Sequence, residues 1–449
     1  MTIMIKKILL LFVFCSSLLE AQHTITGEMQ PPGNFEWIVL YQLKGAKQDY
    51  IANTSIENGK FSFTIPKERP AGIYRMIYNL ENQLFVDFIY DHEDISLVFD
   101  PKLPNQRIQF TQSKNNQIYQ AYLRAIAVPQ QQLDSLQVAY FKNPSAKKIE
   151  VTYAATKKQL DKIQHQYEEK SEGLLVSHFI KSSARYNAAL PIKMPAVYLK
   201  SVKAHFFDHL DFNNSVLLNS TFISDRINDY IFYLNNSDDP STLNKLREEA
   251  IDDVLAKIKS NQTLSRDIQE GLLYNFAQQQ NVPLASHVLN YYIQLPKELQ
   301  DPSFVNDIKG QLRTAVGNIA PNILWKENNT EKSLHKLYGS PYYLVVFWSS
   351  TCSHCLRELP ILKEYLKGKN NIDVIAVGLE NEESKKNWES QIKNYPNWTH
   401  IYGKNKWENR FARAYGVNAT PSFYVLDGQK KILGKPDDVQ ELKVFFKEK

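Results

Sequence analysis

The sequence has 449 residues but only three cysteines, Cys15, Cys352 and Cys355. Structural zinc sites commonly take two spaced pairs of Cys or His ligands, and this chain has a single cysteine pair, which argues against a zinc-held fold. Blocks of like charge are also missing, because the formal net charge of +5 is spread over the whole length. Without a dense basic stripe, nucleic acid is not expected as a partner.

Long apolar runs are absent apart from one near the N-terminus. Residues 8–19 form an apolar run of about 12 residues, whereas a membrane span needs about 20. Lys6-Lys7 precede the run and Ala21 follows it, which is the layout of a secretory signal peptide cleaved after Ala21. The alternatives are a retained membrane anchor and lipoprotein processing at Cys15, although Phe14 stands where a small residue is expected. We expect a soluble, periplasmic protein with no stable membrane insertion after cleavage.

The composition is that of a folded protein, with 43% hydrophobic, 12% aromatic and 22% charged residues. Its length predicts two to four domains. The patterns described below divide the chain into a signal peptide (1–21), an antiparallel β-sandwich (22–110), an α-helical domain (111–305) and a C-terminal α/β domain (311–449).

The segment after the signal peptide has short runs rich in β-branched and aromatic residues, such as residues 37–41, 60–65 and 74–78. Turn residues separate them, as in the sequence Pro31-Pro32-Gly33. Several short strands with regular turns predict an antiparallel β-sandwich. Asn58-Gly59 is the strongest hairpin signal.

The middle of the chain is rich in Gln, Lys, Ala and Leu, and apolar residues recur at three- and four-residue intervals over 116–127, 146–172 and 242–260. This spacing predicts a helical domain. Prolines mark the expected helix breaks, near Pro191, Pro195, Pro240, Pro283 and Pro296.

His205 and His209 could share one face of a helix near Asp208 and Asp211, which raises a metal site as an alternative. A solvated helical surface explains the same pattern more simply, and we predict no metal.

From about residue 310, predicted strands and helices alternate. Residues 342–348 are almost continuously apolar, as expected of a central strand that is buried on both faces. Further strands are predicted at 372–377 and 422–426, helices at 382–395, 407–415 and 437–446, and a turn at Asp427-Gly428.

Cys352-Ser-His-Cys355 follows the central strand directly and precedes a run of leucines at helical spacing. A Cys-x-x-Cys pair can be half of a zinc site, an inert disulfide or a redox dithiol. The sequence has no second cysteine pair to complete a zinc site, and a disulfide across two residues closes almost no loop. The position favours the redox interpretation, because thiolate is stabilised at a helix N-terminus. Cys352 is then the nucleophile, and Cys355, one turn further on, the resolving thiol.

These residues resemble the thioredoxin superfamily, and specifically its exported TlpA/ResA-like branch. The resemblance covers about the last 130 residues and rests on three motifs. They are Gly317-Asn-Ile-Ala-Pro321, Phe347-Trp348-x-x-x-Cys352-x-x-Cys355-x-x-Glu358-x-Pro360, and Tyr415-Gly416-Val417-x-x-Thr420-Pro421-x-Phe423. The preceding regions resemble, more weakly, the front half of thioredoxin-like proteins of the Bacteroidota.

The resemblance implies a thioredoxin-like fold for residues 311–449 and a set of site residues. The family places a cis proline at Pro421, beside the dithiol, where it exposes backbone to a substrate strand. Thr420, Pro421 and Trp348 are accordingly expected to contact substrate. Glu358 matches a carboxylate thought to move protons to and from the thiols, although it could equally be a solvated residue of the first helical turn.

Two departures from the family pattern bear on these implications. Thr351 stands where most members have Trp, and Val346 occupies the position of the buried Asp of cytosolic thioredoxins, so their proton route is absent. Val345 and Ser349 replace the Pro and Thr that a peroxiredoxin requires, which argues against a peroxidase.

The sequence therefore predicts a periplasmic thiol-disulfide oxidoreductase without a cofactor. The resemblance implies protein disulfides as substrates, a membrane electron-donor protein as partner, and physiological use as a reductase. The alternative is a partner-binding or assembly protein whose thioredoxin-like module is vestigial. His354, between the cysteines, is expected to stabilise the Cys352 thiolate and so to give an intermediate redox potential.

Overall fold

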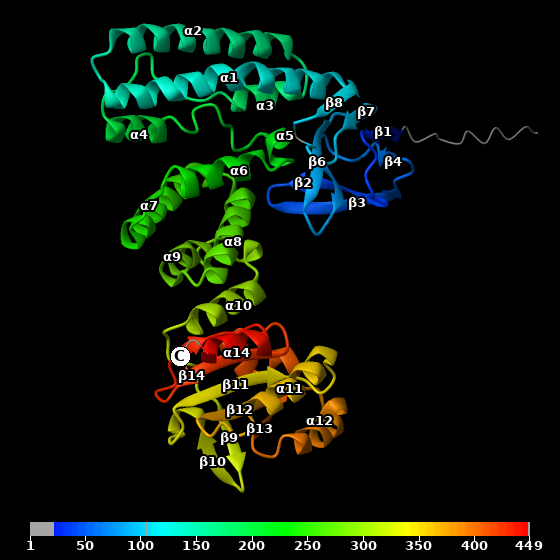
Figure 1. Cartoon of the computed structure of the whole chain (residues 1–449), viewed down its shortest axis with the longest axis vertical. Coiled ribbons are helices and arrows are strands. Elements are labelled where there is room, and N and C mark those ends of the chain that lie inside the picture. Colours follow the sequence, from blue (N-terminus) through cyan, green and yellow to red (C-terminus); the bar gives the residue numbers. More distant parts are fainter. Residues whose placement is uncertain (1–21, 105, 448–449) are drawn as a thin grey trace, which may run out of the picture. The chain divides into compact units, whose positions relative to one another are not determined.

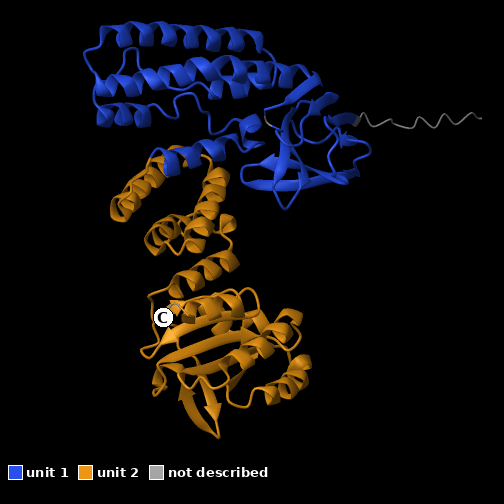
Figure 2. Ribbon diagram, in the orientation of Figure 1, with its two compact units in different colours: residues 1–234 blue, residues 235–449 orange. Residues whose placement is uncertain are grey.

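The computed structural model describes residues 22–104 and 106–447. The predicted signal peptide (1–21), with Cys15, lies outside the described residues and stays a prediction. The chain separates into two compact units, residues 1–234 and 235–449 (Figure 2). The division falls inside the segment that the sequence predicts as one helical domain.

The first unit begins with two four-stranded sheets (Figure 1). Their strand orders are β4-β1-β7-β8 and β3-β2-β5-β6. The strands are β1 Gln22–Met29, β2 Trp37–Lys44, β3 Lys47–Ser55, β4 Lys60–Pro66, β5 Gly72–Asn79, β6 Leu84–Tyr90, β7 Ile95–Phe99 and β8 Ile108–Gln112. One hydrophobic cluster joins side chains of both sheets, which makes this region a sandwich as predicted. It is not wholly antiparallel, because β1 pairs with β7 in parallel.

The predicted hairpin at Asn58-Gly59 is a turn between sheets. Both residues have positive φ, and Glu57 and Lys60 exchange backbone hydrogen bonds of 2.9 Å across the turn. However, β3 pairs with β2, whereas β4 pairs with β1 in the other sheet. The turn chemistry was predicted correctly, but the pairing of the flanking strands was not, because pairing depends on the packing of the whole sandwich.

Helices complete the first unit. They are α1 Lys114–Lys142, α2 Lys147–Lys170, α3 Val176–Ser182, α4 Pro195–Ala204, α5 Ser215–Leu218 and α6 Phe222–Asn228, followed by the π-helical turn Asp229–Tyr233. Leu133 of α1 packs with Tyr153 and Leu160 of α2 in a small core. The predicted helical pattern is confirmed, and Pro195 opens α4, as its missing N–H permits in a first turn.

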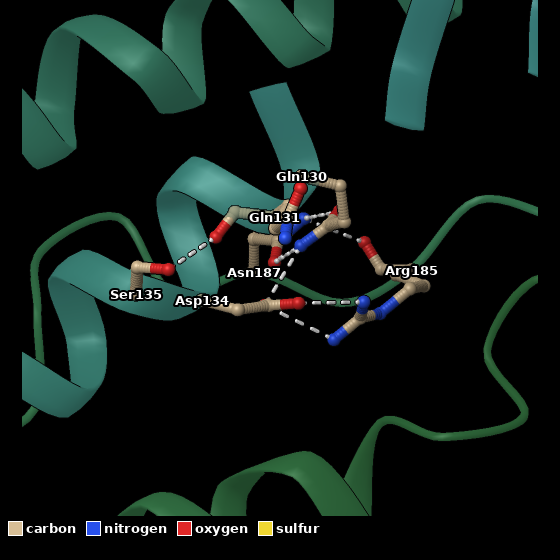
Figure 3. A network of polar contacts seen from close by, with 6 residues as sticks. All are labelled: Gln130, Gln131, Asp134, Ser135, Arg185 and Asn187. Carbon is tan, nitrogen blue, oxygen red and sulfur yellow. Dashed lines mark hydrogen bonds and ion pairs between the residues drawn. The ribbon is translucent and has the colours of Figure 1, made fainter. Parts of the chain in front are cut away.

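A polar network holds the segment after α3 against α1 (Figure 3). Asp134 accepts two hydrogen bonds from the Arg185 guanidinium, at 3.0 and 3.2 Å. Gln130 and Asn187 exchange side-chain amide hydrogen bonds beside it. His205, considered above as a metal ligand, follows α4 directly and pairs with Asp208 at 2.6 Å.

The second unit starts with the helices α7 Pro240–Ile258, α8 Gln262–Gln278, α9 Val282–Tyr292 and α10 Pro302–Arg313. A proline lies in the first turn of α7, α9 and α10. Asp239, Asn281 and Asp301 cap three of them, each side chain accepting a backbone N–H of the first turn. The helix breaks predicted at Pro240 and Pro283 are therefore confirmed.

A mixed α/β domain follows (Figure 1). Its five-stranded sheet has the order β13-β12-β11-β14-β15, with β14 and β15 antiparallel to their neighbours. The strands are β11 Tyr342–Trp348, β12 Ile372–Glu380, β13 Thr399–Lys404, β14 Ser422–Asp427 and β15 Ile432–Gly434, and a separate hairpin joins β9 Leu324–Glu327 to β10 Thr330–Ser333. The helices are α11 Ser353–Leu366, α12 Lys385–Gln391, α13 Arg410–Tyr415 and α14 Val439–Lys447.

Both faces of this sheet are covered. Along β11, Tyr343, Val345 and Phe347 belong to one hydrophobic cluster, and Leu344 and Val346 belong to another. The predicted central strand is confirmed to the residue. The helix predicted over 407–415 is interrupted because Asn409 caps α13, its side chain accepting the Phe411 N–H at 2.9 Å.

Within residues 22–104 and 106–447, no helix has the length and apolarity needed to cross a bilayer.

Candidate functional site

The two cysteines lie where β11 gives way to α11. Cys352 is the N-cap of α11, and its sulfur accepts a hydrogen bond from the Cys355 backbone N–H at 3.2 Å. Both thiols are free; Cys352 is half-buried, and Cys355 is fully buried. The predicted junction of a buried strand and a helix N-terminus therefore exists, and it exposes one sulfur more than the other.

The two thiols differ in acidity. Burial raises the pKa of Cys352, but hydrogen bonds from the Cys355 and Thr420 side chains and from the Cys355 and His354 backbone outweigh it, so that this pKa lies below its ordinary value. Burial and the hydrogen bond to Cys352 raise the pKa of Cys355 to about 12. At neutral pH, Cys352 is thus the better source of thiolate.

The segment before β14 lies against the exposed thiol. The Cys352 Sγ is 3.2 Å from the Thr420 carbonyl oxygen, which accepts a hydrogen bond from it. The Thr420–Pro421 peptide bond is cis. The structure thus brings together Cys352, Cys355, Thr420 and Pro421, which lie apart in the sequence.

Trp348 does not belong to this surface. Its side chain is 1% exposed and packs with Cys355 and Leu359 in the core beneath α11. The expectation that Trp348 contacts substrate is therefore corrected. Trp348 is the last residue of a strand that is buried on both faces. The sequence pattern alone does not show whether the helices that cover the sheet extend over this last residue.

His354 and Glu358 are neighbours on α11. The His354 Nε2 is 3.8 Å from the Glu358 Oε1, and the His354 side chain is half exposed. The Glu358 Oε2 accepts the backbone N–H of Val439 at 3.0 Å, at the first residue of α14. Glu358 therefore links two helices, and its role in proton transfer stays a prediction.

Sequence reasoning missed a buried acid next to the dithiol. Glu380, at the end of β12, is 0% exposed and accepts hydrogen bonds from Ser349, Ser350 and Ser384. The available signal was a single acidic residue closing an apolar strand, together with the serines before Cys352. Among the described residues, no group of three His, Cys, Asp or Glu side chains is arranged to hold a metal ion.

Comparison with known families agrees with this geometry. Residues 339–432 match the family described as thioredoxin-like, which spans the dithiol and the Thr420–Pro421 segment. The C-terminal part of the chain is a thioredoxin-like domain. Residues 23–119 match a domain of unknown function (DUF4369), which corresponds to the sandwich and the start of α1. No curated protein matches the chain.

Several solved structures resemble this thioredoxin-like domain. A domain of a possible thiol-disulfide isomerase from Cytophaga hutchinsonii is 27% identical, with a TM-score of 0.26, and the match covers 30% of this chain and 91% of that one. A thiol:disulfide interchange protein from Bacteroides sp. is 24% identical over 30% and 89% of the two chains, with a TM-score of 0.26. A longer match, to a thioredoxin-like protein from Bacteroides caccae, is 18% identical over 60% and 99%, with a TM-score of 0.39.

Proposed function

We propose that this protein is a periplasmic thiol-disulfide oxidoreductase that reduces disulfides in protein substrates through Cys352 and Cys355. The observation that carries the proposal is the asymmetry of the dithiol: a half-buried thiol with a lowered pKa next to a buried thiol with a raised one. Thiol-disulfide exchange needs this division, because one accessible sulfur must attack the substrate disulfide first and the other must react only with the mixed disulfide that forms.

The reaction proceeds in two exchanges. The Cys352 thiolate attacks a substrate disulfide, its sulfur bonds to one substrate sulfur, and the other leaves as a thiolate that takes up a proton. Cys355 then loses its proton and attacks the Cys352 sulfur, which forms the Cys352–Cys355 disulfide and releases the second substrate sulfur. Two electrons pass to the substrate. A dithiol electron-donor protein in the membrane then supplies two further electrons, which reduce the Cys352–Cys355 disulfide again.

The Thr420–Pro421 segment supplies the substrate side of the site. The Thr420 carbonyl oxygen lies within hydrogen-bond distance of the Cys352 sulfur, so a peptide pairing with this backbone would bring its disulfide to that sulfur. The proposed export rests on the signal-peptide pattern of residues 1–21. The match of the Cytophaga and Bacteroides proteins, which are named for disulfide exchange, agrees with the reaction class.

Turnover of a protein disulfide tests the proposal. Purified protein with dithiothreitol should reduce insulin faster than dithiothreitol alone, and Cys352→Ser should abolish the acceleration. Cys355→Ser should instead accumulate mixed disulfides with periplasmic proteins, which mass spectrometry identifies. Ser353→Ala, which changes an exposed residue between the cysteines, is the matched control and should keep turnover. If the wild-type protein does not reduce insulin and Cys355→Ser traps no mixed disulfides, the alternative of a partner-binding protein with a vestigial module is favoured.

A further inference from the structure

A buried carboxyl group lies beside the loop that leads into the dithiol. β11 and β12 are parallel neighbours, with Trp348 opposite Gly378, so the end of β12 runs next to the residues that follow β11. Glu380 is the last residue of β12 and is fully buried. The Glu380 carboxyl group is therefore inaccessible to solvent, and a buried carboxyl group requires polar partners.

Glu380 finds these partners in three serines. Its Oε1 accepts the Ser350 backbone N–H at 2.5 Å, and its Oε2 accepts hydrogen bonds from the Ser384 Oγ at 2.6 Å and the Ser349 Oγ at 3.4 Å. Ser349, Ser350 and Ser384 are themselves buried. Two of the three donors belong to the loop before Cys352, so Glu380 fixes the course of that loop.

The same loop contacts both cysteines. The Cys352 backbone N–H donates to the Ser349 carbonyl oxygen at 3.1 Å. Burial raises the Cys355 pKa, and the interaction of the Ser349 backbone N–H with the Cys355 sulfur acts against burial by favouring the thiolate. A chain of contacts thus runs from Glu380 through the Ser349–Ser350 loop to Cys355. Without the carboxyl group, the buried Ser350 N–H would lose its acceptor, and the loop would have to move to find another.

The geometry points to Glu380 as a positioning residue of the resolving cysteine: it anchors the Ser349–Ser350 loop and so keeps the Ser349 amide directed at the Cys355 sulfur. The inference rests on the proposed function, because it concerns the second exchange. In that step, Cys355 releases its proton to solvent and its sulfur bonds to the Cys352 sulfur. The bond between Cys352 and the substrate breaks, and the substrate sulfur leaves as a thiolate. The Ser349 amide stabilises the Cys355 thiolate that this step needs.

Reaction with dithiobis(nitrobenzoate) separates the two exchanges, because each releases one coloured nitrothiobenzoate. Attack by Cys352 gives the first release, and attack by Cys355 on the mixed disulfide gives the second. In stopped-flow absorbance, we expect Glu380→Ala to slow the second release about tenfold and to move its pH profile to higher pH. The first release should change less than about twofold, because the backbone amides that bind Cys352 belong to α11.

Two further variants separate anchoring from charge. In Glu380→Gln, the amide oxygen can accept the Ser350 N–H and the amide nitrogen can donate to the serine hydroxyls, so we expect a second release within about twofold of wild type. Glu383→Ala changes an exposed acidic residue three positions beyond Glu380 and serves as the matched control, with the same expectation. Equal slowing in Glu380→Gln and Glu380→Ala would overturn the anchoring role in favour of charge.

An unchanged second release in Glu380→Ala would remove Glu380 from the mechanism altogether. If circular dichroism shows that this variant does not fold, Glu380→Asp takes its place, since it withdraws the acceptor by one methylene and should slow the second release too. The reagent reacts with any accessible dithiol. Absence of both insulin reduction by the wild type and mixed disulfides on Cys355→Ser would therefore refute the proposed function, while the comparison of release rates would still decide the role of Glu380.

Discussion

The N-terminal sandwich and the C-terminal sheet bury their strands in different ways. In the sandwich, β4 and β5 bury every second residue and leave the others at least partly exposed. In the C-terminal sheet, six of the seven residues of β11 are buried on one face or the other. The polar residues differ accordingly. Among residues 23–104 and 106–110, Gln42 is the only buried polar side chain apart from tyrosines, whereas Ser349, Ser350 and Glu380 are buried where β11 and β12 end.

This difference shows why the chemistry lies at strand ends. A strand covered on both faces has no free face on which to present a functional group, so reactive residues gather in the segments that follow the carboxyl ends of such strands. Cys352 and Glu380 both occupy this edge of the C-terminal sheet. In the sandwich, outward-facing polar side chains pair with one another across strands, as Arg75 of β5 does with Asp87 of β6.

The largest expected effect is on stability, when the same charged residue is introduced into a strand of each sheet. Val345→Asp puts a carboxylate at a 0% exposed position of β11, and we expect a loss of more than about 4 kcal/mol, enough to unfold the domain. Thr64→Asp, at an exposed position of β4, should change stability by less than about 0.5 kcal/mol. Hydrogen exchange resolved by peptide reports both regions in one experiment. Equal protection losses in the two variants would mean that the sheets are not buried differently.

The central strand could be predicted from sequence because its signal is local. Residues 342–348 are apolar throughout, and the dithiol follows them directly, so the strand, the helix start and the order of the thiols could all be inferred. The contacts of Glu380 could not, because its donors Ser349 and Ser350 are about 30 positions away in the sequence. The pairing of β3 and β4 with different sheets has the same cause: a turn is set by its own residues, whereas strand pairing is set by the whole core.

The second effect is the difference in alkylation rate between the accessible Cys352 and the buried Cys355. Burial raises the Cys355 pKa to about 12, whereas hydrogen bonds hold the Cys352 pKa below its ordinary value. At pH 7, a much larger fraction of Cys352 than of Cys355 is therefore thiolate. A less basic thiolate is also a weaker nucleophile, which offsets part of this advantage. We expect iodoacetamide to label Cys352 at least about 30-fold faster than Cys355, and labelling of Cys352 to become faster as pH rises towards its pKa. Peptide mass spectrometry measures both rates, and faster labelling of Cys355 would reverse the assignment of nucleophile and resolver.

A smaller effect tests whether Glu358 acts in catalysis or in packing. Glu358→Ala removes the acceptor of the Val439 N–H at the start of α14, and we expect a loss of about 1 kcal/mol, as for other helix caps. Glu364→Ala, which removes only an exposed partner of Lys367 on the same helix, should cost less than about 0.5 kcal/mol. Urea unfolding followed by tryptophan fluorescence suits this domain, since five of the six tryptophans lie between residues 325 and 407.

Insulin reduction by the Glu358 variant decides its second role. If Glu358 only joins α11 to α14, turnover should stay within about twofold of wild type at temperatures where the variant is folded. A loss of turnover without a loss of stability would instead support proton transfer through this carboxyl group, as the family resemblance implies.

The smallest effect concerns His354, for which the structure changes the expected source of thiolate stabilisation. The His354 side chain is half exposed and lies near Glu358, whereas its backbone N–H is hydrogen-bonded to the Cys352 sulfur and lowers the Cys352 pKa. An exposed charged neighbour contributes no more than about 1 kcal/mol. His354→Ala keeps the backbone donor, so it should make the protein more reducing by less than about 20 mV. His354→Pro removes the donor in the first turn of α11, where proline is tolerated, and should raise the Cys352 pKa by about 1. Equilibration with glutathione gives the potentials, and thiolate absorbance gives the pKa values. Equal shifts in the two variants would mean that the imidazole stabilises the Cys352 thiolate, because both substitutions remove this side chain.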